Sequence, residues 1–308
     1  MDTAELIKWF KLCNVKGLGP RKIIRLFDCF KNIDSIWNAE KNELLRSCIF
    51  NEQMVKEWTK LQKASPENFE KIIIECKQNE ISIIPLISKE YPPQLKIIPN
   101  PPVNLFLQGN KQLLKTKKIA IVGSRKSDER SKKWAYNTAI DLVKNGLCVV
   151  SGGAIGVDYE AHKAALDASG NTICIMGPGL LNLFPERNIE LFNKIKKKGL
   201  LISENLPSFP GSRIALLQRN RITSGTSDGL IAVTGTSGHG VMTQLKHAND
   251  QKIPVFCPKL DYGFIPNDGI KEVKEKYNIV EIQNIEPILE MLRNIQETYI
   301  IQKQTKLF

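Results

Sequence analysis

The sequence predicts an α/β protein with a Rossmann-like, doubly wound and mainly parallel sheet, preceded by a small all-helical domain. From about residue 117, short all-apolar runs alternate with helical patterns, which is typical of a parallel sheet covered by helices on both faces. Residues 1–78 show only the helical spacing of apolar residues. We therefore expect a helical domain over 1–78, a Rossmann-like domain over 79–298 and a C-terminal tail over 299–308.

The first domain resembles a helix-hairpin-helix or SAM-like module. Trp9 and Phe10 share one helix face, and the stretch NVKGLGPRKIIRLF follows them. In this stretch Gly17 and Gly19 flank a tight turn, and Pro20 suits the first position of the next helix. Such a turn can offer backbone N–H groups to a phosphate, whereas an ordinary helix corner gives the same pattern, so both interpretations stay open.

Residues 80–117 change in character, because they contain many prolines and two apolar runs. Short strands are expected at Ile81–Leu86 and Val103–Gln108. The segment has too many apolar residues for a free linker, so it should be ordered and packed against the next domain.

The large domain is expected to contain strands and helices in alternation. The strands are predicted at KIAIVG, LCVVSGG, NTICIMG, LLISE, GLIAVTG and IPVFCP. The helices are predicted at Arg130–Asn145, Asp158–Ala168 and Glu186–Lys198, with Asp158 as a helix N-cap. Residues 261 to about 297 should add a helix, a short strand at Ile279–Ile282 and a last helix.

The charge of the chain indicates an anionic partner. The formal net charge is +12 and the isoelectric point is near 9.3, which makes nucleic acid the first candidate, although a solvated basic surface has the same composition. No run approaches the roughly 20 apolar residues needed to cross a bilayer. The seven scattered cysteines form no CxxC pair, so we expect reduced thiols in a cytoplasmic protein, with no metal site and no membrane partner.

Glycine and arginine recur in the segments that follow the predicted strands, where ligands bind in a doubly wound sheet. Glycines let successive backbone N–H groups form a concave anion site, and arginine can bind a phosphate with two parallel hydrogen bonds. The candidate DNA- or phosphate-binding residues are Gly123, Ser124, Arg125, Lys126, Ser151, Gly152, Gly153, Gly156, Phe184, Arg187, Asn188, Arg213, Arg219, Asn220, Arg221, Ser237, Gly238 and His239.

The motifs disfavour small nucleotide cofactors. The Walker A pattern is absent, and the dinucleotide fingerprint at Ser151, Gly153 and Gly156 lacks an acidic residue about 20 positions later. We therefore expect no cofactor. Between Lys115 and Lys133 there are eight basic residues and two acids, a spread that suits a polyanion better than one small ligand.

The stretch LLQRNRITSG, which should end in a small-residue turn, divides its arginines between two roles. We expect one of Arg219 and Arg221 to pair with a carboxylate such as Glu204 or Asp228, while the other faces the ligand. Asn220 should bond the loop backbone.

Aromatic and titratable residues near these segments have two interpretations each. Phe184 and Phe209 suit base stacking, but core packing is the simpler account and is favoured for Phe184. His162 is expected to pair with Asp158, four residues earlier on one helix. Because no nucleophile, base and orienting group can be assembled, we expect no catalytic residues.

Several motifs, in this order and spacing, resemble the DNA-processing protein A (Smf) family. They are EYPPQLKIIPNPPVNLFLQGN, GSRKSDERSKKWA, VVSGGAIGVDYEAH, GLLNLFPERN, ISENLPS, QRNRITSGTSDGLIAV and SGHGVMT. The resemblance covers residues 80–260 well and the helical region loosely. It implies a Rossmann-like homodimer that binds and protects incoming single-stranded DNA and loads the RecA recombinase during natural transformation.

The chain also departs from the usual pattern of that family. Gly153 and Ile155 stand where SGLARGID has Leu and Arg, which removes a positive charge, and the winged helix that ends many members has no counterpart. Two alternatives remain. One is an enzyme similar to the phosphoribohydrolases, although Gln244 replaces their catalytic Glu, and the other is a nucleotide-sensing module.

Overall fold

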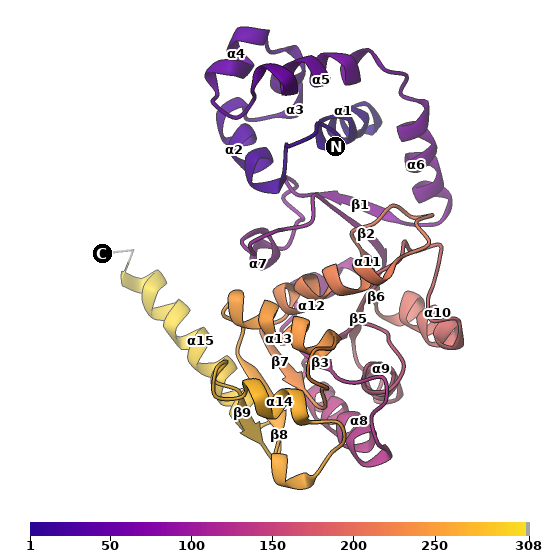
Figure 1. Cartoon of the computed structure of the whole chain (residues 1–308), viewed down its shortest axis with the longest axis vertical. Coiled ribbons are helices and arrows are strands. Elements are labelled where there is room, and N and C mark those ends of the chain that lie inside the picture. Colours follow the sequence, from indigo (N-terminus) through magenta and orange to yellow (C-terminus); the bar gives the residue numbers. More distant parts are fainter. Residues whose placement is uncertain (306–308) are drawn as a thin grey trace.

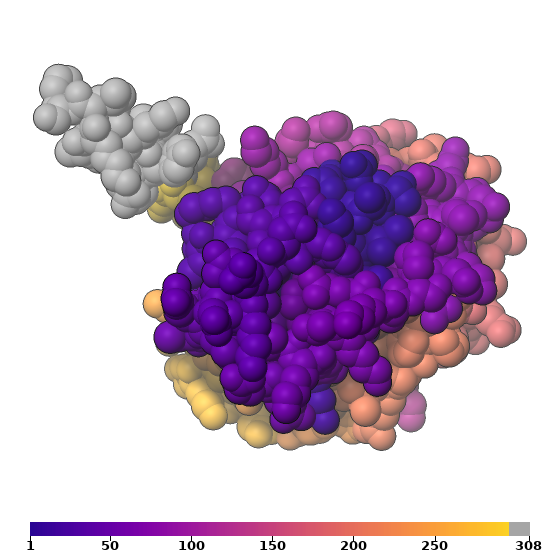
Figure 2. All heavy atoms as spheres, turned by 90° about the horizontal axis from the view of Figure 1, so that it is seen from above, coloured from indigo at the N-terminus to yellow at the C-terminus, as the bar shows by residue number. Residues whose placement is uncertain are grey.

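The computed structural model describes residues 1–305, with the side chains of residues 1–295. Figure 1 shows a group of helices at one end of the molecule and a sheet with its covering helices at the other. Seen from above in Figure 2, the indigo and violet helical domain lies over the sheet domain, whose orange residues emerge around its edge. The predicted α/β class with a small helical domain before the sheet is confirmed.

Six helices form the first domain, and their ends follow local capping signals. Asp2 accepts a hydrogen bond from the backbone N–H of Glu5 in a capping box, and Asn51 caps a later helix through its own side chain. Gly17, with φ +84°, makes the expected turn, and Pro20 opens the next helix. The helices are α1 (Thr3–Cys13), α2 (Pro20–Phe30), α3 (Ile33–Asn38), α4 (Lys41–Arg46), α5 (Glu52–Lys63) and α6 (Glu67–Gln78).

One nine-stranded sheet forms the centre of the second domain. Its order is β1-β2-β6-β5-β4-β3-β7-β8-β9, parallel from β6 to β9 and antiparallel at β1 and β2. The two strands expected before residue 117 thus belong to the sheet itself. The strands are β1 (Ser82–Pro85), β2 (Asn104–Gly109), β3 (Lys118–Val122), β4 (Cys148–Ser151), β5 (Thr172–Ile175), β6 (Leu200–Ser203), β7 (Gly229–Ala232), β8 (Val255–Pro258) and β9 (Val280–Ile282).

Helices cover both faces of the sheet, as the all-apolar strands require. Ile119 and Ile121 of β3 pack in one apolar cluster with α8, α9 and α15, whereas Ala120 and Val122 point into the cluster on the other face. No helix within residues 1–305 is long and apolar enough to span a bilayer. The helices are α7 (Pro93–Lys96), η1 (Lys111–Lys115), α8 (Glu129–Lys144), α9 (Val157–Asp167), η2 (Glu186–Asn188), α10 (Ile189–Lys198), α11 (Arg213–Gln218), α12 (Asn220–Thr226), α13 (Gly240–Asp250), η3 (Leu260–Tyr262), α14 (Asp268–Val273) and α15 (Glu286–Thr305).

The predictions of a turn after Arg221 and of Asp158 as a helix cap were wrong. The small-residue turn expected after Arg221 is instead helix α12, every residue of which is buried. Gly225 is small because the segment between β1 and β2, which includes α7, packs there: a Cβ would lie 2.8 Å from Cγ2 of Ile98. Helix α9 is capped by Gly156, not by Asp158, because the glycine adopts φ +86° just before the helix.

The segment between β1 and β2, residues 86–103 and termed the strap, joins the two domains. Arg21 of α2 donates hydrogen bonds to the carbonyls of Ile97 and Ile98, at 3.0 and 2.8 Å. From the other side, Nε of Arg221 donates to the Asn100 carbonyl at 2.7 Å. The helical domain is therefore docked through the strap backbone onto α12.

Gly109→Ala should lower the free energy of unfolding by about 2 kcal/mol or more, because the added methyl group would clash with the backbone as well as strain a positive-φ residue. Gly109 has φ +114°, and a Cβ there would lie 2.4 Å from the backbone oxygen of Gly199. Gly146→Ala is the matched control, since Gly146 has φ +73° but open space around it. Urea unfolding should give the control a loss of only about 1 kcal/mol. Equal losses would contradict the steric argument.

Candidate nucleic-acid interface

A large cavity lies at the carboxyl ends of the parallel strands, beside β3, where the strand order reverses. The segments after β3, β4, β5, β6 and β7 all contribute to its lining, as the glycine and arginine pattern predicts. A main space of about 910 Å³ adjoins a smaller one of about 330 Å³, and both are lined by Arg125, Ala154, Phe184, Leu216 and Arg219.

Close backbone contacts shape the floor of this cavity. Gly156 packs so tightly that a Cβ would lie 2.7 Å from the backbone oxygen of Ser124. The N–H of Ser124 donates to Oγ1 of Thr234 at 3.0 Å, which ties the segment after β3 to the segment after β7. The backbone that carries Arg125 is thereby fixed on two sides, while its side chain is exposed.

Arg219 has too few partners within the protein. The residue is 7% exposed, yet its buried Nε has no acceptor among the described residues. Its ion pair with Asp158 is long, at 4.0 Å. The guanidinium lies directly over Gly152, where a Cβ would be 1.3 Å from Nη1. A buried guanidinium has five N–H donors, so this one retains donors for a ligand.

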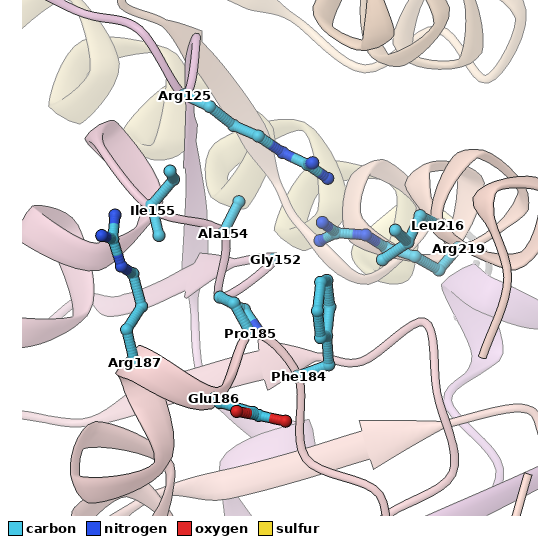
Figure 3. A pocket seen from close by; sticks show the side chains of 11 residues that line it. Arg125, Gly152, Ala154, Ile155, Phe184, Pro185, Glu186, Arg187, Leu216 and Arg219 are labelled. Carbon is cyan, nitrogen blue, oxygen red and sulfur yellow. The ribbon is translucent and has the colours of Figure 1, made fainter. Parts of the chain in front are cut away.

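Arg125 and Arg219 approach each other across the cavity. In Figure 3 their guanidinium groups extend toward one another, with Phe184 below the space between them. Burial lowers the pKa of Arg219, and the positive charge of Arg125 lowers it further. Because like charges repel at this range, a bound anion would stabilise the pair.

Asp158 holds the loop beneath these arginines. Its Oδ2 accepts hydrogen bonds from the backbone N–H groups of Gly152 and Ala154, at 3.2 and 3.3 Å. Burial raises the pKa of this carboxyl, while Arg219 opposes that shift. Asp158 therefore anchors the glycine loop after β4, a role that differs from the expected helix cap.

His162 does not pair with Asp158, so that prediction was wrong. Its Nδ1 is 2.7 Å from Oγ1 of Thr172, and Nε2 has no partner among the described residues. Burial, with a smaller contribution from Arg219, lowers the pKa of His162 to about 3. The imidazole is therefore neutral and structural.

Arg221 is committed to the protein interior. Nη1 and Nη2 each contact a carboxylate oxygen of Glu204 at 2.6 Å, and Nη1 also donates to the carbonyl of Gln218. We expected one of Arg219 and Arg221 to pair with an acid, and the pair is Arg221 with Glu204. The other candidate acid, Asp228, accepts a hydrogen bond from the backbone N–H of Lys118. Arg221 does not line the cavity, and we exclude it from the proposed ligand contacts.

Most of the other candidate residues do line the cavity. They are Gly123, Ser124, Lys126, Gly152, Gly153, Phe184, Arg187, Arg213, Asn220, Gly238 and His239. Phe184 is 49% exposed, which contradicts core packing. Asn220 donates from Nδ2 to the carbonyl of Gly240, as expected for a loop-bonding amide.

Four candidates support the loops and do not line the cavity. Ser151 donates to the carbonyl of Ile121, and Asn188 donates to that of Gly153 at 3.0 Å. Gly156 caps α9, and the N–H of Ser237 donates to Asp268. These residues position the lining without offering atoms to it.

Sequence reasoning missed several apolar lining residues. Leu216 lines both spaces from α11, a helix that was expected to be loop. Leu216 precedes Arg219 by three residues, and residues three apart lie on one face of a helix. This spacing could have indicated that the two side chains line the same space. Ala154, Ile155 and Pro185 complete the apolar wall of the smaller space.

Comparisons with known proteins agree with this architecture. The family described as DNA recombination-mediator protein A matches residues 82–293. The DNA processing protein DprA of Bacillus subtilis is 32% identical over 232 residues, which are 74% of this chain and 77% of the relative. Protein Smf of Synechocystis is 29% identical over 83% of this chain, and the chain spans 65% of that relative's length.

Two solved structures are also similar. DNA processing protein A from Streptococcus pneumoniae superposes with a TM-score of 0.78 at 25% identity, covering 94% of this chain and 98% of that one. DNA processing protein A from Helicobacter pylori, whose structure addresses its single-stranded DNA binding mode, gives 0.62 at 30% identity, covering 70% and 96%.

The buried His162 should make stability depend on pH. An unfolded chain protonates histidine near pH 6.5, whereas the folded protein keeps His162 neutral down to a pKa of about 3. This contribution is therefore complete above pH 6.5 and is lost as the pH falls. Between pH 7 and 5, the wild type should lose about 2 kcal/mol more unfolding free energy than His162→Gln. Identical pH slopes in urea titrations would contradict the burial argument.

Proposed function

Because the chain belongs to the DNA recombination-mediator protein A family, we propose that its arginine-lined cavity binds single-stranded DNA. The observation that carries this proposal is the opposition of Arg125 and Arg219 across the cavity, with Asp158, 4.0 Å away, as the one acid paired with Arg219 among the described residues. A phosphodiester between the two guanidiniums supplies both the charge and the acceptor oxygens that the protein itself does not.

The apolar wall supports a single strand over a duplex. Phe184 and Leu216 line the same space as the arginines, so a base attached to the bound phosphate would meet an apolar surface. Bases in a duplex are stacked and paired, and turning one outward costs a few kcal/mol. The Helicobacter pylori relative, with a structure that concerns single-stranded DNA, supports the same ligand.

The partners follow from the family as further parts of the proposal. A recombination mediator delivers a coated strand to a recombinase, so we propose that the protein protects incoming DNA and loads RecA, in the cytoplasm. We also propose a homodimer. Support comes from β9, one of the two edge strands of the sheet, where Val280 is 48% exposed.

The proposed role is binding and not catalysis. Gln244 stands where phosphoribohydrolases carry a catalytic Glu, and its Nε2 donates to the carbonyl of Asn220. Of the carboxylates on the cavity lining, Asp158 is held by backbone amides of the loop after β4. No described residue pairs a nucleophile with a base on this lining.

Arg125→Ala should weaken binding of oligo-dT about tenfold or more, because the variant cannot form a charge-assisted hydrogen bond to phosphate. The slope of log affinity against log salt should also fall by about 0.7, the value for one phosphate contact. Arg219→Lys keeps the charge but loses the planar fork, so affinity should fall while the slope is nearly retained. Fluorescence anisotropy at several salt concentrations measures both quantities.

Arg46→Ala is the matched control for that series, since it removes an arginine from α4 in the helical domain. It should leave affinity within a factor of about two, because at 0.15 M salt a charge beyond roughly 8 Å is largely screened. If Arg125→Ala behaves like Arg46→Ala, phosphate does not bind between Arg125 and Arg219.

Incubation with nucleoside monophosphates should release no free base, because the lining lacks the catalytic Glu. Chromatography of the nucleotide pool measures the product, and an oligo-dT titration of the same preparation shows that the protein is active. Base release that depends on protein concentration would favour the phosphoribohydrolase alternative.

A further inference from the structure

Three large apolar side chains are exposed beside the cavity, two on loops and one at the start of helix α11. Leu181 is 37% exposed, Leu206 44% and Ile214 66%. Leu181 follows β5, Leu206 follows β6, and Ile214 stands in the first turn of α11. We term these three residues the apolar lip. Burying such side chains would stabilise the fold, so their exposure on neighbouring segments indicates a surface with a ligand.

The backbone under the apolar lip is ordered by contacts between the two loops. The N–H of Leu181 donates to the carbonyl of Pro207 at 3.0 Å, and the N–H of Gly179 donates to that of Phe209 at 2.9 Å. Gly179 is packed so closely that a Cβ would lie 2.0 Å from the backbone oxygen of Leu206. The surface is therefore preformed, which lowers the entropy cost of binding to it.

The apolar lip continues the wall of the cavity. Pro178, Phe184 and Arg213 line the main space, and they belong to the same two loops and the start of α11. Leu181 lies three residues before Phe184, and Ile214 directly follows Arg213. A DNA strand leaving the space between Arg125 and Arg219 on this side would pass from the arginines to the exposed aliphatic side chains of the apolar lip.

We propose that the apolar lip is a base-contacting subsite for the nucleotides next to the one whose phosphate lies between Arg125 and Arg219. This inference rests on the proposed function and extends its footprint beyond the cavity. Single-stranded DNA presents the faces of its bases, and these faces are apolar enough to bury against aliphatic side chains. Duplex DNA presents phosphates outward and would leave the apolar lip uncovered.

The charges around the apolar lip favour a nucleic acid as its occupant. Arg213 stands beside Ile214, and Arg187 lines the smaller space on the Phe184 side. The acid on that rim, Glu186, lies below Phe184 in Figure 3, on the side away from Arg125 and Arg219. Basic groups that alternate with apolar groups along one path match a strand of alternating phosphates and bases.

The test is a double variant, Leu206→Ser with Ile214→Ser, measured on oligo-dT and on an oligomer of equal length with abasic sites flanking one central thymidine. On oligo-dT the variant should bind about tenfold more weakly, because serine buries far less apolar surface against the bases. Its salt slope should stay at the wild-type value, because no phosphate contact is removed. On the abasic strand, the variant and the wild type should bind alike.

Ile97→Ser is the matched control, because Ile97 is 74% exposed on the strap and does not line the cavity. It should leave both affinities unchanged, and urea unfolding should show that all variants are folded. An unchanged affinity of the double variant for oligo-dT, while Arg125→Ala still weakens binding, overturns the subsite and leaves the proposed function standing.

Two further outcomes also decide the question. An equal loss of affinity on oligo-dT and on the abasic strand overturns base contact, because the effect would not depend on bases. Unchanged DNA affinity with impaired loading of a recombinase overturns the subsite and assigns the apolar lip to a protein partner. If the wild type binds neither oligomer, the proposed function and the subsite fail together.

Discussion

The central constraint on the cavity is the placement of two guanidinium groups that repel each other and that the protein only partly neutralises. Arg125 reaches in from the loop after β3, and Arg219 from the junction of α11 and α12. The nearest carboxylate, Asp158, lies 4.0 Å from Arg219 and also accepts two backbone hydrogen bonds. Placing a second cation near a buried one costs free energy, which folding of the rest of the chain must offset.

Glycine at position 152 makes this arrangement sterically possible. The guanidinium of Arg219 occupies the volume that any side chain there would need. Arg221 helps to hold α12, the helix that begins at Asn220, in place. It does so through its bidentate contact with Glu204. Two arginines separated by a single residue thus differ in role, since one is satisfied by the protein and the other faces the cavity.

The sequence was sufficient for the parallel sheet and for the edge of the sheet at which the cavity lies. All-apolar strands such as β3 indicate a buried parallel sheet, and glycine-rich segments after them mark its ligand edge. Helix α12 could not be predicted, because its small residues favour a turn until the strap packs against Gly225. The separate roles of Arg219 and Arg221 were likewise open, since the nearest acid depends on tertiary contacts that local spacing does not encode.

The strap is held through its main chain as well as through buried side chains such as Ile98, which is 4% exposed. Arg21 and Arg221 both donate to carbonyl oxygens, which every amino acid possesses. An exposed position such as Ile97 can therefore be substituted while the path of the segment stays the same, whereas Ile98 is restrained by its contact at Gly225. Homologues should vary at the exposed positions of this connection, while its buried side chains and the two arginines that hold its backbone should be slow to change.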